Sequence, residues 1–116
     1  MAYEVLWAED IDRDLELIFD FLAAATESFG ESNEDAFNRA VQRSAEIEAE
    51  MKALGNAPHQ GTLRPHLGDA VRNVTKNRAV YYFEVDDTRQ VLRILAVFFG
   101  GQDHKSHVLL RLLGPA

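Results

Sequence analysis

The side chains best suited to chemistry lie in the second half of the chain. All four histidines fall there, as do eight of the twelve lysines and arginines. A histidine can give or take a proton near neutral pH, and an arginine can hold a phosphate group. Cleavage of RNA by attack of its 2′-hydroxyl needs a base, an acid and a cation. The candidates for these roles are Arg64, His66, Arg72, Arg78, His104 and His107.

Several of these candidates have a plain structural explanation. Arg72 and Arg78 can pair with acidic side chains of a partner or of the chain's own helices. His66 lies between Pro65 and Leu67, a setting that is typical of an ordinary loop residue. Nothing in the spacing alone decides between these explanations and a catalytic role.

Metal or cofactor chemistry is not predicted. His104 and His107 lie one helical turn apart, which suits two metal ligands, but Asp103 is the only carboxylate beside them. The chain has no cysteine. No glycine-rich phosphate loop, Ser/His/Asp signature or paired-carboxylate motif is recognisable. We therefore expect no metal and no cofactor.

Length and composition are those of one globular domain spanning residues 1–116, with 47% hydrophobic and 27% charged residues. No apolar run approaches the roughly 20 residues that span a bilayer. The N-terminus lacks a signal-peptide pattern, and the absence of cysteine suits a reducing compartment. The expected location is the cytoplasm, without membrane contact.

Charge is unevenly placed along the chain. Residues 1–57 hold 14 acidic and 4 basic side chains, whereas residues 58–116 hold 5 acidic and 8 basic ones. The net charge of −7 argues against broad affinity for nucleic acids, although a locally positive surface remains open. An acidic helical face that keeps the protein soluble explains the asymmetry equally well.

The stretch from Val71 to Phe99 organises the fold. Two runs rich in β-branched and aromatic residues, Ala79–Val85 and Val91–Phe99, flank a polar segment that suits a hairpin turn. A shorter run, Ala70–Thr75, precedes them across Lys76-Asn77, where asparagine tolerates a tight turn. Strict alternation then places Leu92, Ile94, Ala96 and Phe98 on one face of the last strand, and Val91, Leu95, Val97 and Phe99 on the other with Arg93.

Everything before this meander reads as a strand and two helices. Alternating apolar residues from Tyr3 to Trp7 predict the strand. Apolar residues at helical spacing follow from Ile11, and again after Ser32 or Asn33, so two long helices should form an antiparallel hairpin. Residues 57–68 are expected to be a loop and residues 104–113 a short helix. The fold class is α+β.

The order of these elements, with the glycines and prolines between them, resembles that of the RelE/ParE superfamily of bacterial type II toxins. The resemblance covers roughly Tyr3 to Leu112. It depends on Pro58, Gly61, Gly68 and Val71-Arg72, then on Arg78-Ala-Val-Tyr-Tyr and Ile94-Leu-Ala-Val-Phe-Phe-Gly-Gly-Gln-Asp, found in the right order.

This resemblance implies an N-terminal strand, a long antiparallel helical hairpin packed on an antiparallel β-sheet and a short C-terminal helix. It also implies a cognate antitoxin, ParD-like and of the ribbon-helix-helix class, whose C-terminal segment wraps the toxin. Operator DNA would be bound only through that antitoxin. Candidate antitoxin contacts are the apolar residues Phe99, Val108, Leu109 and Leu112.

Two activities occur in the superfamily. ParE-like toxins inhibit DNA gyrase, without chemistry of their own, whereas RelE-like toxins enter the ribosomal A site and cleave mRNA. The long helices and the acidic balance favour the ParE branch. The alternatives are a RelE-like endoribonuclease and an inactive toxin that serves as an assembly partner of its antitoxin.

The resemblance also implies roles for the candidate residues. Arg72 and Arg78 stand near the phosphate-binding arginines of RelE-like nucleases, and His104 and His107 fall where those enzymes place a Tyr or His. The lysine-rich loop of the most active members is missing, since the stretch around Arg64 offers one cation. If the target is gyrase instead, Arg64, Arg72 and Arg78 are the candidate target contacts.

Overall fold

The computed structural model describes residues 2–28 and 32–100. One strand is followed by the helices and then by the remaining strands. In chain order they are β1 (Glu4–Trp7), α1 (Ile11–Ser28), α2 (Asn33–Ala53), the short 3₁₀ helix η1 (Leu54–Asn56), β2 (Thr62–Leu63), β3 (Val71–Lys76), β4 (Ala79–Asp86) and β5 (Val91–Phe99). The short helix expected over residues 104–113 lies outside the described residues.

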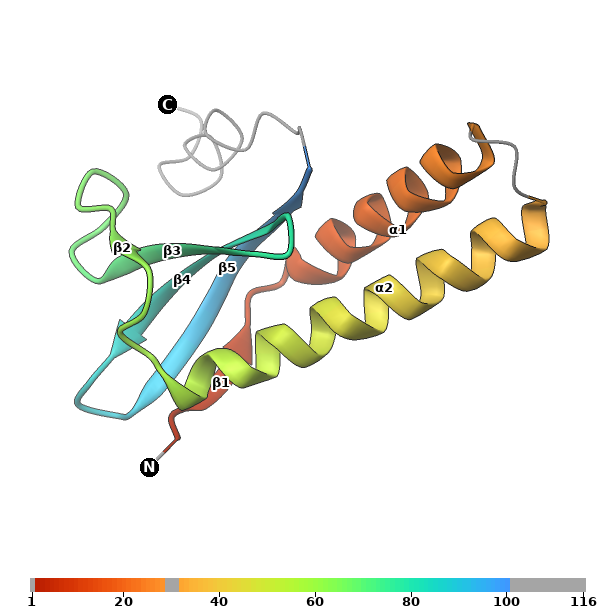
Figure 1. Ribbon diagram of the computed structural model, residues 1–116. Helices are drawn as coiled ribbons and strands as arrows, with labels where there is room; N and C mark the ends of the chain where they lie inside the picture. The colour runs from red at the N-terminus through yellow and green to blue at the C-terminus, as the bar shows by residue number, and fades with distance from the viewer. Residues whose placement is uncertain (1, 29–31, 101–116) are drawn as a thin grey trace.

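The two helices form the predicted hairpin and cover one face of the sheet (Figure 1). On α1, Ile11 and Ile18 are fully buried, as the helical spacing predicts. Ser32 is the N-cap of α2, and its hydroxyl accepts a hydrogen bond from the N–H of Asp35 at 3.2 Å. The helices run side by side and antiparallel, and their far ends project beyond the sheet (Figure 1).

The strands form one sheet in the order β1-β5-β4-β3-β2. The meander β3-β4-β5 is antiparallel, as expected, and β1 joins it in parallel beside β5. The core lies between this sheet and the helices, with Tyr81 and Phe83 among its largest fully buried side chains. A second apolar cluster lies on the opposite face of the sheet and consists of Leu67, Val71, Val80, Tyr82, Leu95, Ala96 and Phe98.

A β-bulge interrupts the pairing of β4 with β5. Tyr82 pairs with Ala96, but Phe83 pairs with Ile94, so that Leu95 is an extra residue in β5. Because side chains alternate along a strand, one extra residue exchanges the two faces for the rest of the strand. The bulge therefore inverts β5 after Ile94.

The expectation of strict alternation in β5 was wrong for this reason. Leu92 and Ile94 face the helices, but the next residues to join that core are Val97 and Phe99. Phe98 lies in the cluster on the opposite face. From Ala96 to Phe99, each side chain thus lies on the face opposite to the predicted one.

The segment 57–68, expected to be a loop, contains the two-residue strand β2. Thr62 and Leu63 pair antiparallel with Asn73 and Arg72 of β3. Gly61 permits this pairing: it has a φ of +79°, and a Cβ there would lie 2.2 Å from the carbonyl oxygen of Asn73. The strand was missed because its pairing depends on the backbone rather than on an alternating apolar pattern.

Candidate functional site

Arg64 lies on the face of the sheet opposite the helices. It follows β2, and its Nε donates a hydrogen bond to Oδ1 of Asn73 at 3.0 Å. Tyr82 lies in the same neighbourhood: its hydroxyl is hydrogen-bonded with Asn73, and the charge of Arg64 acts on it. Burial raises the pKa of Tyr82, while the bond with Asn73 acts in the opposite direction. The phenol is therefore neutral near pH 7 and cannot serve as a base.

Arg72 lies on the other face, which the helices cover. Its Nη1 donates to the carbonyl oxygen of His59 at 2.8 Å. The ring of His59 contacts Oδ1 of Asp87 at 2.7 Å, and the hydroxyl of Tyr3 donates to the same oxygen at 2.8 Å. The bond from Tyr3, followed by that with His59, holds the pKa of Asp87 below its usual range. Arg72 thus ties β3 to the loop after η1, and that loop joins the N-terminus at the β4–β5 turn through Asp87.

Arg78 lies at the opposite end of the sheet, in the β3–β4 turn. Lys76 lies four residue steps along β3 from Arg72, or roughly 13 Å at about 3.3 Å per residue, and Arg78 follows Lys76 by two residues. The guanidinium of Arg78 lies over the ring of Phe99, 5.5 Å from its centroid. The three predicted cations therefore occupy both faces and both ends of the sheet.

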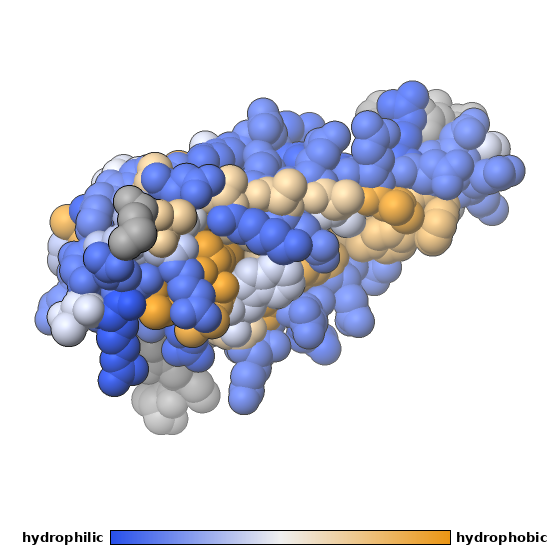
Figure 2. Space-filling model, turned by 90° about the horizontal axis from the view of Figure 1, so that it is seen from below, coloured by the Kyte–Doolittle hydropathy of each residue, from blue (hydrophilic) through white to orange (hydrophobic). Residues whose placement is uncertain are grey.

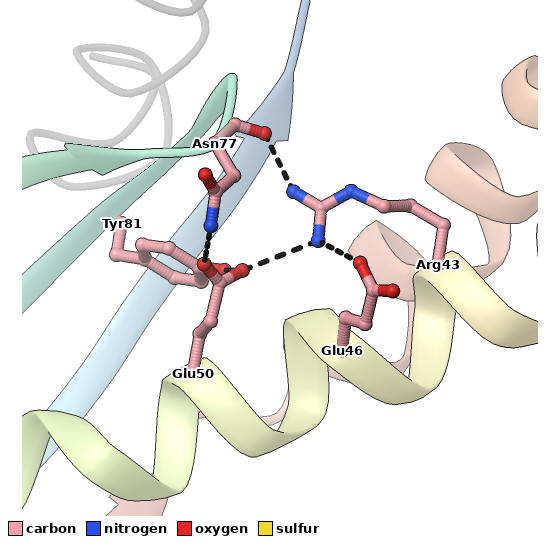
Figure 3. A network of polar contacts seen from close by, with 5 residues as sticks. All are labelled: Arg43, Glu46, Glu50, Asn77 and Tyr81. Atoms are coloured by element: carbon pink, nitrogen blue, oxygen red, sulfur yellow. Dashed lines mark hydrogen bonds and ion pairs between the residues drawn. The ribbon is translucent and has the colours of Figure 1, made fainter.

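A polar network joins α2 to the same turn (Figure 3). Glu50 accepts hydrogen bonds from the hydroxyl of Tyr81 at 2.8 Å and from Nδ2 of Asn77 at 2.9 Å. Arg43 contacts Glu50 at 3.4 Å and Glu46 at 3.2 Å, and its Nη2 donates to the carbonyl oxygen of Asn77. Burial, with the bond to Glu50 second, raises the pKa of Tyr81. The network is a fixed support for the turn rather than an acid–base pair.

A hollow of about 500 Å³ opens at the other end of the sheet, around the β4–β5 turn. Its arginines face carboxylates: Arg93 lies 3.7 Å from Glu84, and Arg89 lies 3.8 Å from Asp86. These four charges offset one another in pairs. The hollow therefore offers a phosphate group little net attraction.

The remaining predicted residues cannot be assembled into one site. His66 is exposed in the loop before β3. Among the antitoxin-contact candidates, Phe99 is buried, at 5% exposure, and serves as a platform for two guanidinium groups, because Arg43 lies 5.4 Å from its centroid as well. The predicted residues His104, His107, Val108, Leu109 and Leu112 lie outside the described residues.

Two further expectations concern metals and membranes. No group of three or more His, Cys, Asp or Glu side chains suited to a metal ion occurs within residues 2–28 and 32–100. Over the same ranges, neither helix combines the length and the apolar character that crossing a bilayer requires.

The architecture matches that of solved toxin structures. A chain of the chromosomal ParDE toxin–antitoxin system from P. aeruginosa has a TM-score of 0.63 and 20% identity, over 84% of this chain and 96% of that one. A chain of the toxin–antitoxin complex RelBE2 from Mycobacterium tuberculosis has a TM-score of 0.56 and 16% identity, over 88% and 95%. A double arginine-to-alanine mutant of E. coli toxin RelE in the free state has a TM-score of 0.61 and 12% identity, over 97% and 96%.

This chain has the RelE/ParE fold. No family model and no curated protein matches the sequence, so the likeness is one of structure. The polar network around Arg43 and Glu50 in this fold was not predicted from the sequence. Its one visible signal was Asn77, a residue that tolerates the positive φ of a tight hairpin turn.

Proposed function

We propose that the protein is the toxin of a type II toxin–antitoxin pair and that it acts in the ParE manner, by inhibiting DNA gyrase. The toxin assignment is supported by the RelE/ParE fold, since the ParDE and RelBE2 structures that it resembles are toxin–antitoxin assemblies. The choice of gyrase is supported by the dispersal of the cations. Arg64, Arg72 and Arg78 lie apart, whereas a nuclease needs its cation, acid and base around one phosphate.

The antitoxin proposal is supported by exposed apolar surface on the helices. Figure 2 shows apolar atoms running between the hydrophilic side chains of the face seen from below. The large apolar side chains that are more than two-fifths exposed on the helical hairpin are Leu17, Phe21, Phe37 and Val41. Exposed apolar surface of this kind marks a protein-interaction site. A ParD-like antitoxin that also binds operator DNA is the proposed partner, and the cytoplasm the proposed location.

One observation favours the second candidate function, a RelE-like mRNA endonuclease. Arg64, Asn73 and Tyr82 lie together on the face opposite the helices, so that a cation and a hydroxyl are neighbours there. RNA cleavage there would still need a base, and Tyr82 is not one at neutral pH. This site is therefore incomplete within the described residues.

Controlled expression tests the toxin assignment. Expression of the chain in a bacterial host is expected to arrest growth, and co-expression of the protein encoded by the adjacent gene is expected to restore it. Purified toxin should then inhibit supercoiling by gyrase and produce linear plasmid. Growth without arrest would contradict the toxin assignment, and arrest with normal supercoiling would contradict the choice of gyrase.

A further inference from the structure

We propose that Arg78 is the residue with which the toxin binds a carboxylate on the surface of its protein target, and that Phe99 and the α2 network position it for that contact. This inference rests on the proposed toxin function. It adds to that function a contact residue, the chemistry of the group it meets and the elements that hold it in place.

The turn that carries Arg78 has an unusual backbone. Asn77 has a φ of +49° and Arg78 a φ of +71°, so both turn residues are left-handed, as a type I′ hairpin turn requires. Glycine is the usual residue at the second position, and a long side chain there is disfavoured. A residue held in a disfavoured conformation by its surroundings is often a functional one. The chain thus has an arginine where glycine would suit the backbone better.

Three hydrogen bonds hold this turn in place. Nη2 of Arg43 donates to the carbonyl oxygen of Asn77, and Nδ2 of Asn77 donates to Glu50 at 2.9 Å (Figure 3). The N–H of Gly100 donates to the carbonyl oxygen of Arg78 at 3.0 Å. Because α2 and the end of β5 both hold the turn, the backbone at Arg78 is fixed before any partner binds, and the ring of Phe99 lies beneath the guanidinium.

Two guanidinium groups lie over the ring of Phe99, and they differ in whether carboxylates lie close enough to neutralise them. Arg43 is largely buried, at 17% side-chain exposure, and is balanced by Glu46 and Glu50. Arg78 is exposed, and no carboxylate lies within ion-pair distance of it among the side chains that the structure describes. Within the described residues the stacked guanidinium is thus uncompensated, which points to an anionic group on another molecule.

The surroundings favour a protein carboxylate over a nucleic-acid phosphate. The ring of Phe21, 42% exposed, lies 6.2 Å from that of Phe99, and Leu17 lies one turn earlier on α1. Exposed acidic residues, Asp12, Glu16 and Asp20, lie on the same helix. A nucleic acid carries a charge every few ångströms and would be repelled by these residues. A protein surface with one carboxylate beside apolar side chains matches this corner of the toxin.

This geometry favours a folded protein as the partner that Arg78 contacts. A guanidinium that is fixed in the free toxin lowers the ordering cost of docking against a surface that is itself rigid. An antitoxin segment that folds as it binds adapts its own shape and has less need of a fixed cation. We therefore assign Arg78 to the target rather than to the antitoxin. Because Leu17 and Phe21 also belong to the proposed antitoxin surface, a bound antitoxin would exclude the target from this corner.

The substitution Arg78→Gly tests this directly, because glycine suits the left-handed backbone while the guanidinium is lost. We expect the melting temperature to stay the same or rise, while the toxin concentration needed to inhibit purified gyrase rises about tenfold, the factor that corresponds to 1.4 kcal/mol. Arg78→Lys should retain part of the activity, because the charge remains and the planar group is lost. Arg89→Ala, an exposed arginine at the other end of the sheet, is the matched control and should behave like wild type.

Growth arrest in cells, scored for the same variants, separates this inference from the gyrase proposal. If wild-type toxin arrests growth but leaves supercoiling intact, the gyrase proposal fails, and loss of arrest in Arg78→Gly still supports the inference. Undiminished arrest by Arg78→Gly would overturn it, as would an equal loss in Arg89→Ala. Parallel losses of affinity for the adjacent gene's protein, or for a DNA duplex, would also overturn it, because the cation would then meet the antitoxin or a phosphate.

Discussion

The carboxylate of Asp14 in α1 accepts a hydrogen bond from the backbone N–H of Val97 in β5, at 3.0 Å. Both residues are buried, and Val97 lies three residues beyond Ile94, where the pairing of β1 with β5 ends. A helix side chain thus supplies the acceptor that a longer β1 would have supplied. The contact fixes α1 on the sheet just after the bulge, at the point where the helices begin to cover Val97 and Phe99.

Removal of this acceptor should destabilise the fold. Asp14→Ala leaves the buried N–H of Val97 without its partner, so the free energy of unfolding should fall by about 1–3 kcal/mol. Asp14→Asn keeps a carbonyl oxygen and should cost less. Urea denaturation of the two variants checks this, and equal stability of Asp14→Ala and wild type would show that the bond contributes little.

Alkaline pH should weaken the fold through Tyr81. Its pKa is raised from the usual 10.0, so the unfolded chain loses this proton at a lower pH than the folded protein does. The stability that the buried phenol contributes is complete below about pH 10 and is lost as the pH rises further. Unfolding free energy measured from pH 8 to 11 should fall more steeply in wild type than in Tyr81→Phe. Identical slopes would contradict the buried, neutral phenol bonded to Glu50.

Asp87 should titrate below its usual pKa of 3.8 because Tyr3 and His59 bond its charged form. Tyr3→Phe removes the first of these bonds and should raise the pKa of Asp87. Since a lowered pKa stabilises the fold above the unfolded value, this small contribution is lost as the pH falls through the folded value. NMR titration of the side-chain carboxyl carbon measures both proteins, and an unchanged value in Tyr3→Phe would exclude the contact in solution.

Gly55 should resist substitution because β1 passes directly over it. A Cβ at this position would lie 2.3 Å from the carbonyl oxygen of Tyr3 and 2.9 Å from a methyl group of Val5. Gly55→Ala should therefore displace the start of β1 and cost about 1–3 kcal/mol of stability. Asn56→Ala, at the exposed neighbouring position, is the control. Hydrogen exchange of the β1 amides should increase only in Gly55→Ala, and unchanged exchange would contradict the close approach.

The general fold could be predicted because its signals are local. Helical spacing identified most of the buried residues of α1 and α2, although Phe37 and Val41, which share the apolar spacing of α2, are exposed. Alternation identified the strands up to Ile94. The bulge at Leu95 could not be predicted, because the extra residue is defined only by pairing with β4. That single residue is why the expected faces of Val97 and Phe99 were reversed.

The candidate site was harder to predict because its contacts are distant in sequence. Arg43 and Asn77 are 34 residues apart, and neither lies in a motif. Arginines that looked like one group, Arg64, Arg72 and Arg78, are separated because successive residues of a strand face opposite sides and because β3 spans the length of the sheet. Sequence spacing identified the cations, but the sheet decided which of them have neighbours in common.

The most direct test of the proposed function compares two purified systems with the same toxin preparation. One contains gyrase with relaxed plasmid, and the other contains ribosomes programmed with mRNA. Inhibited supercoiling with intact mRNA is the predicted result. Cleaved mRNA in the A site with unaffected supercoiling would contradict the gyrase proposal and favour the endonuclease.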